Sequence, residues 1–331
     1  MTTESTASFG DAIGALGDGI VWVGTQIVLG FWHLLLGILP FLSDSVTEKG
    51  KPIPPLFDWL IWDGSTEDKQ SLMAFVYYGG SVEFFFIVLN IVLVTTLYGM
   101  FLNRNFLWGG VRVLEGIANG LGRLFAWAGL LMVLQQIIIV FMQRIFTRPD
   151  ISIGFGIPLQ FDISWFAEEL KLYNALVVTL CVTYTFVQGG HVRVDLIYSA
   201  VSHRTKRIID MIGSLLFMVP AAVLIWMYSW FFLWRHLIVP KPSASDTLDR
   251  LLTKARAVRW NVETIGFSPN GFTAYFLFKV LLVAFTGLVF LQAIAFFWRS
   301  YLELKEGEAS AGKYLDKDSL GEGEEAYEGT H

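Results

Sequence analysis

The sequence predicts an all-α, polytopic integral membrane protein with about six transmembrane helices. Apolar residues make up 54% of the 331-residue chain and charged residues only 16%, a balance that a soluble core of this size does not accommodate. Six apolar stretches are long enough to be spans, since a helix needs about 20 residues to cross the hydrocarbon core. Each span is expected to be helical because lipid cannot satisfy free backbone groups.

The predicted spans are residues 20–42, 82–102, 124–146, 172–188, 208–234 and 272–298. Basic residues gather after the second span, after the fourth and after the sixth. The positive-inside rule therefore puts these regions, and both termini, in the cytoplasm. The loop between the fifth and sixth spans is also basic, yet this scheme makes it external.

A short amphipathic helix is predicted within that loop. Asp246 can cap it, and apolar residues recur at helical spacing from residue 248 to residue 258, with Arg and Lys on the other side. Two interpretations stay open: the helix covers the end of the bundle, or it docks a partner.

The sequence contains few residues or motifs that would support a catalytic or redox function. Cys181 is the only cysteine, so one chain can form neither a disulfide nor a cysteine metal site. The motifs H-E-x-x-H and G-x-S-x-G and glycine-rich phosphate loops are absent. The net charge of −5 comes largely from the tail beyond Glu303, which lacks an apolar period and is expected to be disordered. We expect neither an enzyme nor a nucleic-acid partner.

Polar residues inside the spans are interpreted as links between helices. Asn90, Gln135 and Gln136 lie in apolar segments, where an amide can hydrogen bond to a neighbouring helix. Arg207 and Asp210 are three residues apart at the start of the fifth span, so they can pair on one helix face.

Two strings in the second half of the chain are more specific. Residues 165–170 read WFAEEL and lead directly into the fourth span, and residues 190–196 read GHVRVDL. A basic stretch follows at residues 202–207 and leads into the fifth span. In this order the features resemble the small membrane subunit, the DctQ-like subunit, of the tripartite ATP-independent periplasmic (TRAP) transporters of bacteria and archaea.

The resemblance covers residues 123–304 and implies a region of four helices. Most family members have four spans, so residues 1–122 look like an N-terminal extension with two helices, and residues 305–331 are expected to form a disordered acidic tail. The matching positions that we take as candidates for partner binding and assembly are His191, Arg193, Asp195, Glu168, Glu169, Arg207, Asp210 and Lys279.

The resemblance also implies a role. The chain would sit in the cytoplasmic (inner) membrane and scaffold a large permease subunit that carries the sodium and substrate sites. A periplasmic binding protein would deliver an organic anion of the carboxylate type. No cofactor is implied for this subunit, and the sodium gradient would act through the large one.

Two rival functions remain open at this point. A self-sufficient six-helix transporter or channel would be active alone and would show internal repeats, which we do not see. A membrane enzyme would need several polar side chains gathered at one site on one face of the membrane. The best available candidates for such a site are His191, His203 and Asp195.

Overall fold

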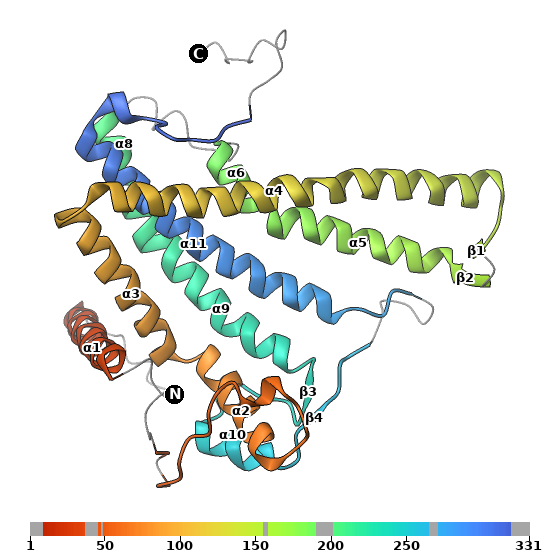
Figure 1. The fold of residues 1–331 in the computed structure, drawn as a ribbon, viewed down its shortest axis with the longest axis horizontal. Helices are drawn as coiled ribbons and strands as arrows, with labels where there is room; N and C mark the ends of the chain where they lie inside the picture. The colour runs from red at the N-terminus through yellow and green to blue at the C-terminus, as the bar shows by residue number, and fades with distance from the viewer. Residues whose placement is uncertain are drawn as a thin grey trace, which may run out of the picture. The chain divides into compact units, whose positions relative to one another are not determined.

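The computed structural model describes residues 9–36, 46–47, 49–154, 158–189, 201–264 and 271–318. Helices dominate this part of the chain (Figure 1). Five of them are long and apolar enough to cross a membrane, and a bent pair can supply a sixth span. The prediction of a polytopic all-α membrane protein is thereby confirmed. The chain divides into two compact units, residues 1–98 with 238–261 and residues 99–237 with 262–331, which are described separately.

The first unit contains the apolar helix α1 (Phe9–Leu35) and all but the last three residues of the apolar helix α3 (Val82–Phe101). The Asn90 side chain on α3 donates hydrogen bonds to the carbonyl oxygens of Ile27 on α1, at 3.1 Å, and of Phe86, at 2.7 Å. The predicted link between helices at Asn90 is therefore confirmed.

The rest of the first unit is a small packed domain. Its elements are η2 (Asp58–Leu60), α2 (Thr66–Gly79), β3 (Ile238–Val239), α10 (Leu248–Ala255) and β4 (Arg259–Trp260). Helices α2 and α10 pack together, and Leu72, Met73 and Leu251 are fully buried between the elements. Ser65 caps α2 by accepting the backbone N–H of Asp68 at 3.0 Å, an arrangement that stabilises a helix start.

Helix α10 confirms the predicted amphipathic helix but not its cap. Thr247, not Asp246, is the N-cap residue, and it makes no side-chain capping bond. The buried Asp246 carboxylate instead pairs with Lys254 at 2.6 Å and with Arg250 at 3.2 Å. Arg250 and Lys254 are four residues apart and share one face of α10, so a single carboxylate can pair with both.

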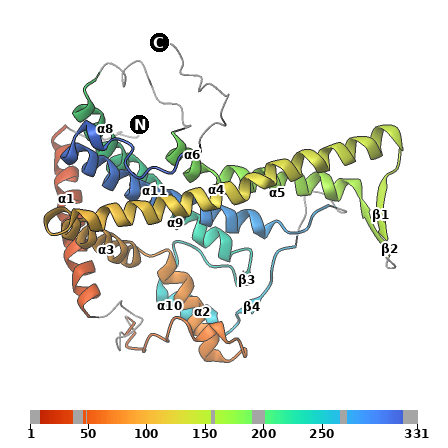
Figure 2. The ribbon, with the colours of Figure 1, turned by 45° about the horizontal axis from the view of Figure 1, so that its top comes forward.

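The second unit is built around α11. Its elements are α4 (Arg104–Val140), η3 (Phe141–Ile145), β1 (Asp150–Gly154), β2 (Pro158–Asp162), α5 (Ile163–Leu180), α6 (Val182–Gln188), α8 (His203–Gly213), η4 (Ser214–Met218), α9 (Val219–Trp234), α11 (Phe276–Glu306) and η5 (Glu308–Ser310). Helix α11 packs against α4, α5, α8 and α9. Helices α4 and α5 run side by side and end at the antiparallel β1–β2 hairpin (Figures 1 and 2).

Helix α4 is longer than the predicted third span. Together with η3 it runs over 42 residues, Arg104–Ile145, roughly 63 Å at 1.5 Å per residue and about twice the hydrocarbon thickness. The basic stretch before residue 124, expected as a loop, is its first half. Asn103 caps this helix by accepting the N–H of Asn105 at 3.1 Å, and Leu107 and Val111 are fully buried.

The fourth span is longer than predicted and is broken. Helix α5 begins at Ile163, and a bend of 42° separates it from α6. The Asp162 side chain caps its start by accepting the N–H of Ser164 at 2.8 Å. The WFAEEL string therefore occupies the first turns of the helix rather than an external stretch before it.

The polar segment after the sixth span is ordered up to residue 318. Helix α11 continues to Glu306, and η5 follows it. This differs from the expectation of disorder from Glu303 onward, and the reason is the set of ionic contacts described below. Residues 319–331 lie outside the described part of the chain.

Candidate assembly site

Five charged side chains, three of them buried, form a cluster in the second unit, which we call the arginine cluster. It consists of Glu115 on α4, Arg207 and Asp210 on α8, and Arg299 and Glu303 on α11. Arg299 donates two hydrogen bonds to the Glu115 carboxylate, at 2.6 and 2.5 Å. Arg207 lies 2.6 Å from Glu303 and 3.2 Å from Asp210. The cluster thus ties α4, α8 and α11 together, and the predicted pair of Arg207 and Asp210 is confirmed.

The burial of this cluster makes it energetically important. Glu115, Arg299 and Glu303 are 5%, 7% and 1% exposed. Charges removed from water are tolerated only when they are paired and hydrogen bonded. The Arg299 guanidinium also donates to the carbonyl oxygen of Lys313 at 3.1 Å, and the Gly312 N–H donates to Glu303 at 3.2 Å.

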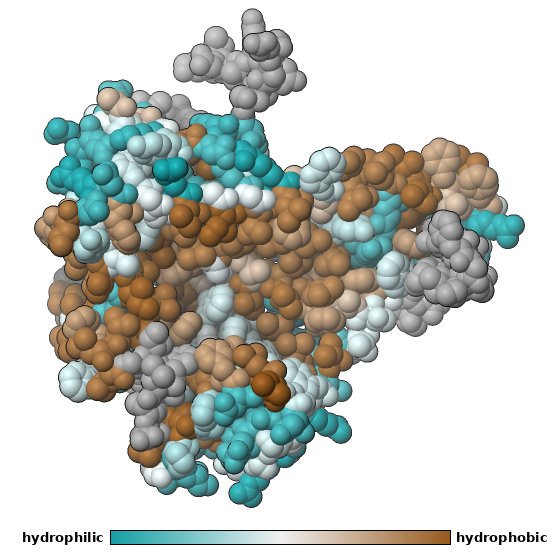
Figure 3. Space-filling model, viewed as in Figure 1, coloured by the Kyte–Doolittle hydropathy of each residue, from teal (hydrophilic) through white to brown (hydrophobic). Residues whose placement is uncertain are grey.

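These two backbone contacts belong to residues 307–318, which we call the C-terminal strap. The strap follows the first half of α4. Arg123 binds the Asp316 carboxylate through both terminal nitrogens, at 2.8 and 3.0 Å, and Asp318 at 2.6 Å. Asn119 donates to the carbonyl oxygen of Asp316 at 2.8 Å. Figure 3 shows hydrophilic colouring where α8 and the end of α11 meet, and hydrophobic colouring along α4 and α5.

The strap also reaches the end of α6. The Gln188 side chain donates to the carbonyl oxygen of Asp316 and accepts the N–H of Asp318, both at 3.0 Å. The Tyr184 hydroxyl donates to the Asp318 carboxylate. The strap therefore holds Gln188, which lies two residues before the GHVRVDL string.

Acid is expected to detach the strap. The Arg123 guanidinium holds the pKa of Asp316 below its usual value of 3.8, and the Tyr184 hydroxyl, together with Arg123, lowers the pKa of Asp318. When folding lowers the pKa of a carboxyl, its contribution to stability is complete above the ordinary pKa and disappears as the pH falls through the lowered one. A spin label at Lys317→Cys, in a Cys181→Ala background, should therefore be immobile at pH 6 and become mobile only as the pH falls below the ordinary carboxyl pKa of 3.8.

The matched control for this experiment carries Asp316→Asn and Asp318→Asn. Its label should already be mobile at pH 6, because neutral amides cannot form the ion pairs. A label that stays immobile in this variant, or in the parent until the whole protein unfolds, would contradict the ionic attachment.

Glu168 and Glu169 lie on α5, away from the arginine cluster. Glu169 accepts hydrogen bonds from the Gln135 amide on α4 and from the Tyr173 hydroxyl, both at 3.0 Å. Gln135 also donates to the carbonyl oxygen of Phe166 at 3.1 Å, which confirms its predicted role between helices. Glu168 is buried, and the Gly271 backbone packs so closely that a Cβ there would lie 2.0 Å from the Glu168 carboxylate.

Lys279 is buried near the start of α11. Its amine lies 3.6 Å from the centre of the Phe232 ring and donates a hydrogen bond to the Tyr275 hydroxyl at 3.2 Å. Contacts of a cation with a ring face are attractive. Lys279 and Glu303 are 24 residues apart on α11, roughly 36 Å along the helix. The structure therefore does not bring Lys279 together with the arginine cluster.

His191, Arg193 and Asp195 lie outside the described residues, so their part in assembly stays a prediction. Within the described ranges, no three His, Cys, Asp or Glu side chains gather as metal ligands.

Sequence reasoning missed Glu115 and Glu303 as partners, and Asp316 and Asp318 as anchors. The available signal was that Glu115 and Arg299 each have mostly apolar or aromatic neighbours in the sequence, since a buried charge needs a counter-charge. Nothing in the pattern indicated which residues would meet.

Comparison with known families finds one match, and most of the matched residues lie in this unit. Residues 137–243 match the family described as "Tripartite ATP-independent periplasmic transporters, DctQ component". The match runs from the last turn of α4 through α5, α6, α8 and α9 to just past β3, and covers about a third of the chain. No curated protein and no solved structure matches the chain.

Proposed function

We infer that this chain, whose residues 137–243 form a DctQ domain, scaffolds the large subunit of a TRAP transporter as its small permease subunit. The domain is the observation that carries this conclusion. In the finer proposal, the large subunit couples sodium to the uptake of an organic anion of the carboxylate type. The chain then helps a periplasmic binding protein to dock. It lies in the inner membrane, with both termini in the cytoplasm.

The arginine cluster supports a scaffold role. A subunit that braces a moving partner needs helices that keep their relative positions. Arg207 and Asp210 lie within the matched residues 137–243, and they belong to the same ionic cluster as Glu115 on α4 and Arg299 on α11. The cluster therefore joins the matched region to the first half of α4 and to α11. Separating these helices would leave charges unpaired in a poorly solvated place.

Copurification tests the proposal. The tagged chain is extracted from its native membrane in mild detergent, and the proteins that accompany it are identified by mass spectrometry. A large polytopic permease in near-equal amount is the expected result. A homo-oligomer without such a partner would instead favour the self-sufficient transporter or channel.

Substitutions in the GHVRVDL string are expected to weaken this association. Arg193→Ala and Asp195→Ala should each reduce the recovered permease several-fold, and uptake with it, without changing which substrate is carried. Arg148→Ala removes a charge from an exposed position elsewhere in the DctQ domain and is the matched control. A changed substrate preference in either string variant would contradict the scaffold role, because selectivity would then reside in this chain.

A further inference from the structure

The contacts of the C-terminal strap are those of a bound peptide. Figure 1 shows this end of the chain as a blue trace that runs from α11 toward α6. The Gln188 side chain donates to the carbonyl oxygen of Asp316 and accepts the N–H of Asp318, both at 3.0 Å. One amide thus pairs with the main chain at two places, two residues apart. Main-chain hydrogen bonds of this kind supply affinity when a protein binds an extended peptide.

Two carboxylates of the strap enter the same site. Arg123 contacts the Asp316 carboxylate at 2.8 and 3.0 Å and the Asp318 carboxylate at 2.6 Å. The Tyr184 hydroxyl also donates to Asp318. Side chains two residues apart in an extended segment point to the same side, so one guanidinium can hold both. The site therefore selects a segment with carboxylates at positions i and i+2.

The helix side of this site contains a buried amide that needs an acceptor. Asn119 on α4 is 1% exposed. Its amide nitrogen donates to the carbonyl oxygen of Asp316 at 2.8 Å and to its carboxylate at 3.3 Å, and its amide oxygen accepts the Gln188 amide at 3.2 Å. Among the described residues, the acceptors of the Asn119 amide all belong to the strap. Losing them without replacement would be unfavourable.

The strap itself can leave this site while the helices stay folded. None of residues 311–318 is buried, so the segment has no core of its own. The side chains of Arg123, Asp316 and Asp318 are 43%, 60% and 48% exposed, and ion pairs this exposed are weak. Ordering the segment also costs conformational entropy. The attachment is therefore reversible.

We propose that Asn119, Arg123, Tyr184 and Gln188 form a recognition site for an extended acidic peptide with two carboxylates two residues apart. The strap is its resident ligand and binds in cis. An acidic segment of another protein binds in its place when the strap leaves, because both ligands need the same guanidinium and the same amides. A tethered ligand competes at an effective concentration on the order of millimolar, so the strap inhibits this site. The site does not depend on a permease partner.

Peptide titration of the purified full-length chain tests the proposal. The variant with Asp316→Asn and Asp318→Asn, here called the open variant, has a strap without the two carboxylates. The peptide GKYLDKDS, residues 312–319, is titrated to millimolar concentration against dye-tagged protein, with microscale thermophoresis as the readout. If it binds the open variant with a Kd of about 0.1 mM, binding to the parent should be about tenfold weaker, because the tethered strap competes. The same peptide with asparagine at both aspartate positions should bind the open variant about tenfold more weakly or worse.

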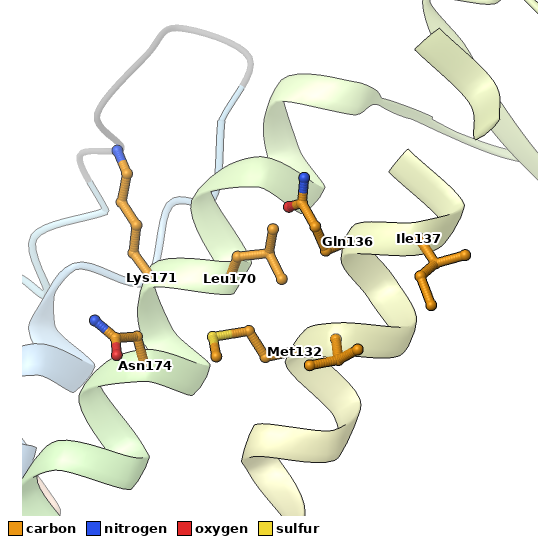
Figure 4. Close-up of a pocket in the computed structure, with 7 residues that line it drawn as sticks. Met132, Gln136, Ile137, Leu170, Lys171 and Asn174 are labelled. Atoms are coloured by element: carbon orange, nitrogen blue, oxygen red, sulfur yellow. The ribbon is translucent and has the colours of Figure 1, made fainter. Parts of the chain in front are cut away.

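Substitutions in the open variant test the helix side of the site. Arg123→Gln and Gln188→Ala should each weaken peptide binding about tenfold. Arg104→Gln is the matched control for charge, since it removes an exposed arginine from the same helix. Gln136→Ala is the matched control for an amide: Gln136 is exposed in the groove between α4 and α5 that Figure 4 shows, roughly 25 Å along α4 from Asn119. Both controls should bind the peptide as the open variant does.

Four results would overturn the site. They are a lack of peptide binding to the open variant, equal binding to the open variant and the parent, equal binding of the aspartate and asparagine peptides, and equal losses in the Arg123 and Arg104 variants. The reactivity of the buried Cys181 thiol with a dye shows that each variant is folded. A chain that binds the peptide but recovers no permease would refute the proposed function and leave this site standing.

Discussion

Arg299→Met should destabilise the protein by about 3–5 kcal/mol, the cost of breaking a buried ion pair from one side. The substitution leaves the Glu115 carboxylate, which is 5% exposed, without its two hydrogen bonds from the guanidinium. It also removes one of the two arginines that contact Glu303. Cys181 is buried and is the only thiol of the chain, so a thiol-reactive dye reports unfolding directly. The midpoint of that transition should fall well below that of the parent.

Two further variants separate charge pairing from general damage. Arg104→Met removes an exposed arginine from the start of α4 and should leave the midpoint nearly unchanged. The double variant Glu115→Leu with Arg299→Met removes both charges, so it should be more stable than Arg299→Met alone. If the two substitutions simply add, the pair does not have the energetic role that its geometry indicates.

Gly122→Ala should be the second most damaging single change, with a cost of about 1–3 kcal/mol. A Cβ at this position would lie 2.1 Å from the Cβ of Tyr184 and 2.4 Å from its Cγ. Those atoms are fixed close to the backbone of α6, so rotation of the side chain cannot relieve the clash and the two helices must move apart. The Cys181 thiol, which lies 3.5 Å from the carbonyl oxygen of Gly122, should then react with the dye at a lower temperature.

Gly120→Ala is the matched control on the same helix. No atom lies within 4 Å of its Cβ position, and alanine favours a helix over glycine by about 0.5–1 kcal/mol. The control should therefore be as stable as the parent or slightly more so. Equal shifts in the two glycine variants would show that α4 and α6 are not packed as closely as described.

The sequence predicted the features that depend on neighbouring residues. The spans follow from local hydropathy, and the pair of Arg207 and Asp210 follows from a spacing of three on one helix. The first half of α4 was missed for the opposite reason. Its charges lower the local hydropathy, but Glu115 and Arg123 are matched by residues close to the other end of the chain. A local pattern cannot anticipate contacts across 184 or 193 positions.

The candidate site was predicted in a similarly uneven way. The family resemblance included the residues that match the DctQ family, and it made Arg207 and Asp210 candidates. It did not reach Glu115 or Asp316, which lie outside residues 123–304, the range of the resemblance. Lys279 and Glu169 were also candidates, but the structure puts each in a separate environment with aromatic or amide partners. The role of the GHVRVDL string stays a prediction.

The sequence separation within the arginine cluster also has a consequence during synthesis of the chain. Glu115 leaves the ribosome 184 residues before Arg299, a delay of roughly 10–40 s at typical elongation rates of 5–20 residues per second. Through that interval the carboxylate has no guanidinium to pair with, and burying it alone would be costly. The first half of α4 should therefore stay at the membrane surface and pack into its final position only after α11 has been translated.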